Sequence, residues 1–220
     1  MDLSVIIPVY NEEKTIGEVV DSVLNVARDL GCKTEVVVID DGSIDGTKRV
    51  LDGYKDIRVL THEINLGKGR ALIDGFGYAT GDAIVMIDSD GQMNPEDIPK
   101  LYEKLKAFDV VCGFRVDRND PILRKILSKV FNNMVRILLG MRITDALCSL
   151  KGFRRDVTKI ETRANGWLMD LELVWRARRK GYAYVEVPVS HNPRRYGHSK
   201  ISVKSIVRMI YGLVLLRVHG

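Results

Sequence analysis

The sequence predicts an α/β protein in which helices cover both faces of a mostly parallel β-sheet. Short runs such as residues 36–39, Val-Val-Val-Ile, are apolar without polar alternation, as in strands that are buried on both faces. These runs alternate with stretches whose apolar residues recur at helical spacing. The 220 residues, 45% hydrophobic and 29% charged, suit one large domain. We therefore expect a single domain over residues 1–220.

Strands and helices are expected to alternate through the first half of the chain. The predicted strands cover residues 3–9, 36–39, 58–60, 83–87 and 110–113. The predicted helices cover residues 12–30, 69–79 and 95–106, with a further helix that begins at Asp45 or Thr47. Parallel sheets bind their ligands beyond the carboxyl ends of the strands, so the functional residues are expected there.

Beyond Phe114 the pattern changes to two amphipathic helices, at residues 122–139 and 201–218. In the first, apolar side chains such as Ile126 and Phe131 fall on one side, and basic and amide side chains fall on the other. Charged residues interrupt the second helix too often for an ordinary membrane span. The sequence leaves three roles open for these helices: contact with a membrane surface, core packing, or a homodimer interface.

The net charge of +5 conceals an asymmetry between the two halves of the chain. Residues 1–114 carry 12 Lys and Arg against 21 Asp and Glu, and residues 115–220 carry 22 against 8, so the halves are −9 and +14 and sum to +5. An acidic half suits a cation site. A basic half suits a polyanion such as a diphosphate, a nucleic acid or an anionic membrane.

Three polar segments directly follow predicted strands, at residues 8–12, 40–43 and 88–92, and should meet at one edge of the sheet. The third contains Asp88-Ser89-Asp90, in which two carboxylates stand close together at the end of a buried strand. Such a pair is costly unless it faces solvent or a cation. Oxygen ligands suit Mg²⁺ or Mn²⁺, and the predicted metal ligands are Asp88, Asp90 and Gln92. Acidic loops of this form are common, so the motif needs its context.

The context is a resemblance carried, in order, by Val-Ile-Ile-Pro-Val-Tyr-Asn-Glu at 5–12, Asp-Asp-Gly-Ser at 40–43, Asn-Leu-Gly-Lys-Gly at 65–69 and Asp-Ser-Asp-Gly-Gln at 88–92. The first half of the chain resembles the family 2 inverting glycosyltransferases, which have a Rossmann-like GT-A fold. The resemblance implies a nucleotide-sugar donor and a metal that binds its diphosphate. The residues that it assigns to the nucleotide sugar are Pro8, Tyr10, Glu12, Asp41, Lys68, Asp88 and Ser89.

Each of these roles has a structural alternative. Tyr10 offers a ring face to a base, and Glu12 and Asp41 can accept hydrogen bonds from a base or a ribose. Equally, Tyr10 can be a packing residue, Glu12 a helix-capping residue and Asp41 a turn residue. The segment around Lys68 completes neither GxGxxG nor GxxxxGK[ST], so its simple interpretation is the entry turn of a helix.

The second half resembles the polyprenyl-phosphate sugar synthases, the dolichyl-phosphate mannose and glucose synthase branch. The resemblance rests on Arg115, on residues 145–153 and on Arg-Tyr-Gly-His-Ser-Lys at 195–200. It implies that residues 1–114 bind donor and metal, that residues 115–220 bind a polyprenyl phosphate, and that the donor is a UDP- or GDP-hexose. The resemblance also implies that Arg115, Arg195 and Lys200 bind phosphate groups. Together with Asp90 they form the predicted catalytic set.

A phosphate acceptor removes the need for a general base, because a phosphomonoester has a second pKa of about 6 and is already an anionic nucleophile at neutral pH. A glycan hydroxyl would need a base, and Asp170 is the candidate for that alternative. Asp170 and Glu172 can instead pair with Arg176 or Arg178 along a helix.

The remaining expectations concern partners and location. The N-terminus has no secretory signal pattern, and three widely spaced cysteines suggest no disulfide framework, so we expect a cytoplasmic protein at the cytoplasmic face of a membrane. A non-enzyme alternative is a nucleic-acid-binding module that uses the basic half. Tyr182, Tyr184 and Tyr196 form no evident stacking array, so we expect no nucleic-acid partner. A homodimer is a further expected partner state.

Overall fold

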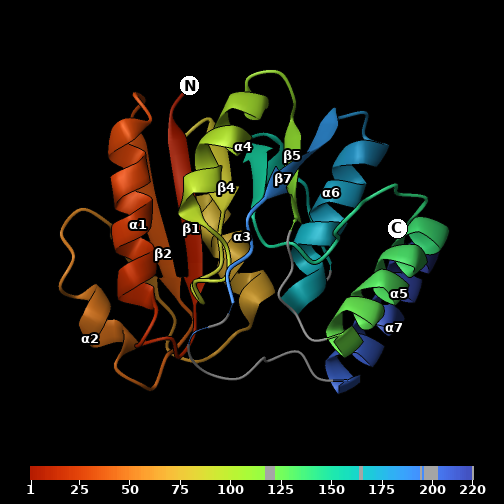
Figure 1. Ribbon diagram of the computed structural model, residues 1–220, viewed down its shortest axis with the longest axis horizontal. Coiled ribbons are helices and arrows are strands. Elements are labelled where there is room, and N and C mark those ends of the chain that lie inside the picture. Colours follow the sequence, from red (N-terminus) through yellow and green to blue (C-terminus); the bar gives the residue numbers. More distant parts are fainter. Residues whose placement is uncertain (117–121, 164–165, 194, 196–202, 220) are drawn as a thin grey trace.

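The computed structural model describes residues 1–116, 122–163, 166–193, 195 and 203–219. Within these residues one sheet has the strand order β3-β2-β1-β4-β6-β5-β7 and runs through the centre of the molecule (Figure 1). All of its pairings are parallel except the two that β6 makes with β4 and β5. The strands are β1 (Leu3–Val9), β2 (Thr34–Asp40), β3 (Arg58–Thr61), β4 (Ala83–Met86), β5 (Val110–Arg115), β6 (Lys151–Arg154) and β7 (Tyr184–Val189).

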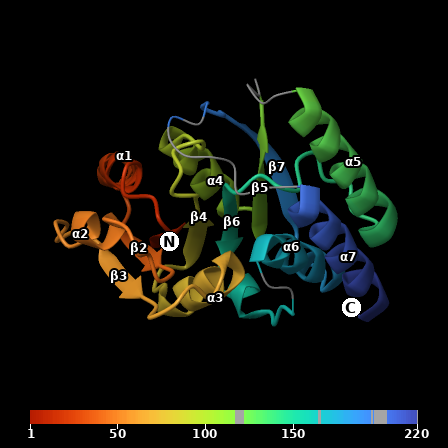
Figure 2. The same cartoon turned by 90° about the horizontal axis from the view of Figure 1, so that it is seen from below.

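Helices cover both faces of this sheet, as the sequence predicts. Figure 2 shows α1 and α4 on one side and α3 and α6 on the other. The α-helices are α1 (Ile16–Asp29), α2 (Thr47–Leu51), α3 (Lys68–Tyr78), α4 (Ile98–Leu105), α5 (Ile122–Leu139), α6 (Met169–Arg179) and α7 (Val203–His219). Short 3₁₀ turns lie at η1 (Pro95–Asp97), η2 (Val157–Lys159) and η3 (Gly166–Leu168).

The two faces of the sheet bury two separate hydrophobic clusters. In β1 the side chain of Ile6 joins the cluster under α3 and α6, and its neighbour Ile7 joins the cluster under α1 and α4. Both residues are fully buried because alternate strand side chains point to opposite faces, and both faces here are covered. This double burial explains why the apolar runs of β1, β2 and β4 show no polar alternation.

The predicted fold class is confirmed, and the differences are local. The first helix begins at Ile16 rather than residue 12, because residues 12–15 form a turn in which Thr15 and Ile16 donate to the Glu12 carbonyl. Strands β6 and β7 were not predicted. The antiparallel β6 enters the sheet between β4 and β5, where α4 packs so closely that a Cβ on Gly152 would lie 2.9 Å from Leu105.

Helices α5 and α7 lie side by side next to the end of the sheet that carries β5 and β7 (Figure 2). The predicted bounds of α5 are confirmed, and residues 201–202 of the second predicted helix lie outside the described residues. Both helices contribute to the core, for example through Phe131 and Leu213, and both also expose large apolar side chains. No helix in the described part of the chain combines the length and apolarity needed to cross a membrane.

Glu35 joins β2 to its neighbours. Its Oε1 accepts hydrogen bonds from the Ser4 hydroxyl at 2.6 Å and from the Thr80 backbone and hydroxyl, and its Oε2 accepts from Arg58 at 2.8 Å. Partial burial alone would raise the pKa of Glu35, but these bonds outweigh it and lower the pKa from 4.5 to about 2.

We expect Glu35→Gln to lower Tm at pH 7, and this deficit to shrink as the pH falls from 4.5 to about 2. A depressed pKa in the folded state adds stability above the unfolded pKa, and protonation of Glu35 removes that stability in the wild type. Calorimetry of both proteins across this range measures the difference, with exposed Glu63→Gln as the control. A deficit that is constant with pH would contradict the assignment.

Candidate active site

The three polar segments predicted to converge do meet, at the carboxyl ends of β1, β2 and β4. They line a cavity of about 280 Å³, which we call the main cavity. The start of α3 and residue Gly166 complete its wall. Its lining consists of Pro8, Val9, Tyr10, Glu12, Asp41, Asn65, Gly67, Lys68, Asp88, Ser89, Asp90 and Gly166. The structure thus brings together every residue predicted to contact the nucleotide sugar, and Asp90 with them.

Hydrogen bonds join the loop after β1 to the loop after β2. Asn11, in the left-handed region at φ 52°, donates its backbone N–H to Ser43 Oγ at 2.9 Å and accepts from the Ile44 backbone at 2.8 Å. The Glu12 backbone donates to Thr47 Oγ1 at 2.9 Å. The Glu12 carboxylate accepts from the Thr15 hydroxyl at 3.2 Å, so Glu12 both lines the main cavity and caps the turn into α1.

Asp41 holds a distant loop through its carboxylate. Its side chain is 4% exposed, and its carboxylate accepts from the backbones of Leu66 at 2.9 Å and Gly67 at 2.8 Å. Its Oδ1 also lies 2.8 Å from His62 Nδ1. Asp41 therefore ties the β3–α3 loop to the end of β2, and contact with a base or a ribose stays a prediction.

Asp88 and Lys68 form an ion pair inside the main cavity, with 2.5 Å between Asp88 Oδ1 and Lys68 Nζ. Burial alone would raise the pKa of Asp88, but the charge of Lys68, hydrogen bonds from Lys68 and Ser149, and the charge of Lys151 together lower it. Asp88 is therefore an ionised carboxylate. A cation already compensates its charge at the place where the sequence predicts a metal.

The donor atoms present fit a metal that is shared with a ligand. Asp88 and Asp90 supply carboxylate oxygens, and within the described ranges no group of three or more His, Cys, Asp or Glu side chains is arranged to hold an ion. Mg²⁺ characteristically binds through one or two carboxylates together with substrate phosphates and water. The two carboxylates fit this pattern, and metal binding by Asp88 and Asp90 stays a prediction.

Gln92 does not line the main cavity. Its side chain is buried, and its Nε2 lies 3.4 Å from His191 Nε2, while its backbone N–H donates to Asp90 Oδ1 at 3.1 Å. This placement makes Gln92 a support for the Asp90 turn. Its predicted role as a metal ligand remains untested.

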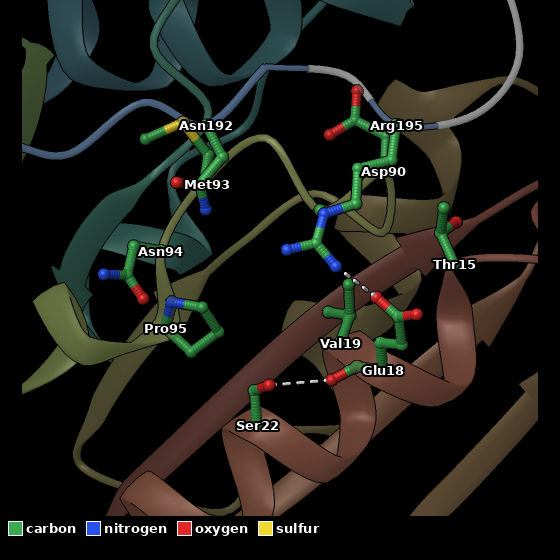
Figure 3. A pocket seen from close by; sticks show the side chains of 11 residues that line it. Thr15, Glu18, Val19, Ser22, Asp90, Met93, Asn94, Pro95, Asn192 and Arg195 are labelled. Carbon is green, nitrogen blue, oxygen red and sulfur yellow. Dashed lines mark hydrogen bonds and ion pairs between the residues drawn. The ribbon is translucent and has the colours of Figure 1, made fainter. Parts of the chain in front are cut away.

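A second, smaller cavity of about 160 Å³ shares Asp90 with the main cavity. Figure 3 shows Arg195 reaching across it to Glu18 on α1, at 3.2 Å between Nη1 and Oε2. Both side chains are well exposed, so this ion pair adds little stability. Arg195 thus lines the same small cavity as Asp90 of the predicted metal-binding turn, and phosphate binding by Arg195 stays a prediction.

Arg115, a second predicted phosphate-binding residue, does not line the main cavity. Arg115 donates to both carboxylate oxygens of Asp145, at 2.6 and 2.9 Å, and its side chain is only 8% exposed. This bidentate pair uses two of the donors that a phosphate would need. Lys200 lies outside the described residues. Phosphate binding by Arg115 and Lys200 stays a prediction.

Asp170, the alternative base, forms a buried ion pair with Lys151 of β6. Lys151 is fully buried, and its ammonium group also donates to the carbonyls of Cys148 at 2.5 Å and Ala146 at 3.3 Å. The expected helical pairing is confirmed only for Glu172, which accepts from Arg176 at 2.6 Å. The pairing of Asp170 with an arginine was wrong, because its partner comes from the sheet beneath α6.

Sequence reasoning missed His62, Lys151 and Gly166. A lysine inside the otherwise uncharged segment 146–153 was the available signal for a buried ion pair. His62 begins the β3–α3 loop and Gly166 begins the 3₁₀ turn η3, and the sequence carried no comparable signal for either of them.

Comparison with known proteins places these features in a family context. The family profile described as glycosyl transferase family 2 matches residues 4–160. The undecaprenyl-phosphate 4-deoxy-4-formamido-L-arabinose transferase of Klebsiella pneumoniae (strain 342) is 35% identical over 219 residues, which span 96% of this chain. The enzyme of the same name from Pectobacterium atrosepticum is 32% identical over 97% of this chain. The chain spans 66% of the length of each of these relatives.

Solved structures of glucosyl-3-phosphoglycerate synthase from Mycobacterium tuberculosis share the fold. The complex with Mn²⁺, UDP-glucose and phosphoglyceric acid matches with a TM-score of 0.80 at 25% identity, covering 98% of this chain and 79% of the synthase. The complex with Mg²⁺ and UDP matches with a TM-score of 0.79 at 25% identity over the same shares. The sheet and its helices are therefore those of a GT-A glycosyltransferase.

Proposed function

The chain belongs to glycosyl transferase family 2, and on that premise we propose that it transfers a hexose from a nucleotide-diphosphate sugar to a polyprenyl phosphate, with inversion at the anomeric carbon. One observation carries the donor half of this proposal: residues from four separate segments, each predicted to contact a nucleotide sugar, line one cavity. The names of the undecaprenyl-phosphate relatives support the acceptor half. Family membership argues against the alternative of a nucleic-acid-binding module.

The donor is bound in the main cavity, with its diphosphate at Asp88, Ser89 and Asp90. Mg²⁺ or Mn²⁺ held by Asp88 and Asp90 would offset the charge that grows on the leaving diphosphate. Lys68, which pairs with Asp88 in the same cavity, would supply a positive charge to these phosphates. UDP is the favoured nucleotide and GDP the alternative. The solved relatives with UDP, Mn²⁺ and Mg²⁺ support this assignment.

The acceptor phosphate attacks the anomeric carbon from the face opposite the diphosphate and needs no general base. The buried pair between Lys151 and Asp170 favours this acceptor over a glycan hydroxyl. To act as a base, Asp170 would have to leave a fully buried ammonium group, which would then lack its counter-charge. Arg195, with Lys200, is the proposed guide for the acceptor phosphate. Catalysis then consists mainly of positioning and charge stabilisation.

Helices α5 and α7 are the proposed membrane contact, at the cytoplasmic face where a lipid-linked phosphate would lie. Ile122 and Ile137 at the two ends of α5 are 77% and 79% exposed, and Val218 of α7 is 67% exposed. Exposed Lys125 and Lys129 lie between the two isoleucines along α5. Exposed apolar side chains with basic neighbours suit an anionic bilayer.

The direct test of the function is a transfer assay with UDP- and GDP-hexoses, Mn²⁺ and a short-chain polyprenyl phosphate. The proposal predicts a lipid-linked sugar product with the opposite anomeric configuration to the donor. Transfer to a glycan hydroxyl without transfer to the lipid phosphate would instead establish the alternative that uses Asp170.

We expect the double variant Lys125→Glu/Lys129→Glu to bind anionic vesicles at least about tenfold more weakly than the wild type, since each basic residue near such a surface contributes about 1 kcal/mol. The vesicles contain about 30 mol% phosphatidylserine in phosphatidylcholine. Sedimentation with vesicles measures the binding. Lys48→Glu/Lys55→Glu is the matched control, because it changes two exposed lysines on α2 and in the segment that leads into β3, the strand at the far edge of the sheet. Equal loss in both variants would contradict a local docking surface, and a concentration-dependent dimer without vesicle binding would assign the helices to self-association.

A further inference from the structure

His62 stands between two acidic side chains from different elements. Its ring is 9% exposed, with Nδ1 2.8 Å from Asp41 Oδ1 and Nε2 3.1 Å from Asp74 Oδ2 on α3. A proton on Nδ1 can be donated to the Asp41 carboxylate, whose oxygens accept hydrogen bonds. The Nε2 contact with Asp74 has ion-pair distance, although Nε2 has no hydrogen-bond partner among the described residues. The bond to Asp41 is thus the stronger of the two contacts.

Asp41 in turn is hydrogen-bonded to the β3–α3 loop. Its two carboxylate oxygens accept from the backbones of Leu66 and Gly67, and its carbonyl accepts from Asn65 Nδ2 at 3.3 Å. Three consecutive residues of the loop are therefore held by one aspartate. His62 contacts the same aspartate from the opposite end of this loop.

The β3–α3 loop follows a path that depends on an unusual backbone conformation and on one close backbone contact. Gly67 has φ 91°, a conformation that favours glycine, and it immediately precedes α3. Across the loop, the backbone of Ile64 and Asn65 lies so near Gly42 that a Cβ there would come within 2.5 Å of the Ile64 carbonyl carbon. Asn65, Gly67 and Lys68 all line the main cavity, so a shift of this loop would move one of its walls.

We propose that His62 is a positioning residue for the donor: it orients Asp41, and Asp41 holds residues 65–67 as a wall of the main cavity. His62 itself does not line the main cavity. This inference rests on the proposed function only in identifying the ligand of that cavity as a nucleotide sugar. The mechanical part, from His62 through Asp41 to the loop, can be measured without any ligand.

The first experiment measures amide hydrogen exchange of ligand-free protein at Leu66 and Gly67. His62→Leu fills a similar volume without a donor and is expected to speed exchange at both amides by about tenfold, since local opening becomes easier. His62→Asn keeps a donor near the position of Nδ1 and should restore much of the protection. Glu63→Gln, an exposed neighbour, should leave both rates unchanged. Unchanged rates in a folded His62→Leu protein would overturn the proposal.

The second experiment uses the same variants in transfer assays. His62→Leu is expected to raise the KM for the nucleotide sugar about tenfold and to change kcat less than about threefold, because a positioning role acts on donor binding. His62→Asn should recover most of the KM. A fall in kcat with an unchanged KM would overturn the assignment to the donor.

The two experiments separate this inference from the proposed function. If the wild type binds no nucleotide sugar, the proposed function fails, and the exchange rates still decide whether His62 holds the loop. If exchange rises in His62→Leu while the donor KM stays the same, His62 holds the loop but the assignment of that loop to the donor is overturned.

Discussion

Asp90→Ala is expected to reduce sugar transfer by roughly 100- to 1,000-fold, the scale on which a single charge-stabilising group acts at a transition state. Asp90 stands where the main cavity and the smaller cavity meet, one residue beyond Ser89 and two beyond the ionised Asp88. Without Asp90, the metal would retain one carboxylate from this turn. The response of nucleotide-sugar binding to Mn²⁺ should then disappear.

Steady-state transfer assays over a series of Mn²⁺ concentrations measure this effect. Asp56→Ala is the matched control, because it removes a highly exposed carboxylate near β3, away from the site. Asp90→Asn keeps the size of the side chain and can still accept from the Gln92 backbone, so it separates the loss of charge from the loss of the turn. An Asp90→Ala protein with normal metal dependence would refute its role as a ligand.

Lys151→Met is expected to destabilise the fold by about 3–5 kcal/mol, because it leaves the carboxylate of Asp170 buried without its counter-charge. Lys151 is fully buried. Burial alone would lower its pKa, but Asp170 and nearby groups hold the pKa above its ordinary value. The lysine is therefore charged. Its loss also removes the hydrogen bonds that its ammonium group donates to the carbonyls of Ala146 and Cys148.

Denaturant unfolding measures this effect, and the double variant Lys151→Met/Asp170→Leu is its control. Removing both charges should recover much of the lost stability, since buried ion pairs can often be replaced by apolar residues at little cost. A double variant no more stable than Lys151→Met would show that the aspartate is not the source of the lost stability.

Asp170→Asn should retain transfer to lipid phosphate in the transfer assay, whereas loss of a catalytic base would abolish transfer.

The sequence predicted β1, β2, β4 and β5 well because their apolar runs lack polar alternation, and it predicted the exposed β3 from the short run at residues 58–60. It missed β6 and β7 for physical reasons. β6 has only four residues, with Lys151 and Arg154 at its ends, and β7 contains Glu186 and Pro188. Proline is tolerated in β7 because this strand lies at the edge of the sheet. Local patterns cannot show that a later strand will enter between two earlier ones.

For the candidate site, likewise, the sequence predicted the position in the fold but not the partners of the individual side chains. Segments after strands could be assigned to one edge because parallel strands end together, and the lining of the main cavity agrees with that expectation. The partners of individual side chains could not be assigned in this way. The pairing of Asp41 with His62, of Arg115 with Asp145 and of Asp170 with Lys151 each joins residues 19 to 30 positions apart. Such contacts depend on how the loops pack and not on spacing along the chain.

Calorimetric titration of the protein with UDP- and GDP-hexoses, with and without Mn²⁺, tests the central claim most directly. The account predicts that one nucleotide sugar binds at least about tenfold more tightly with Mn²⁺, and that Asp88→Ala and Asp90→Ala each abolish this difference. Binding of equal strength with and without the metal, or no binding of either nucleotide sugar, would contradict it.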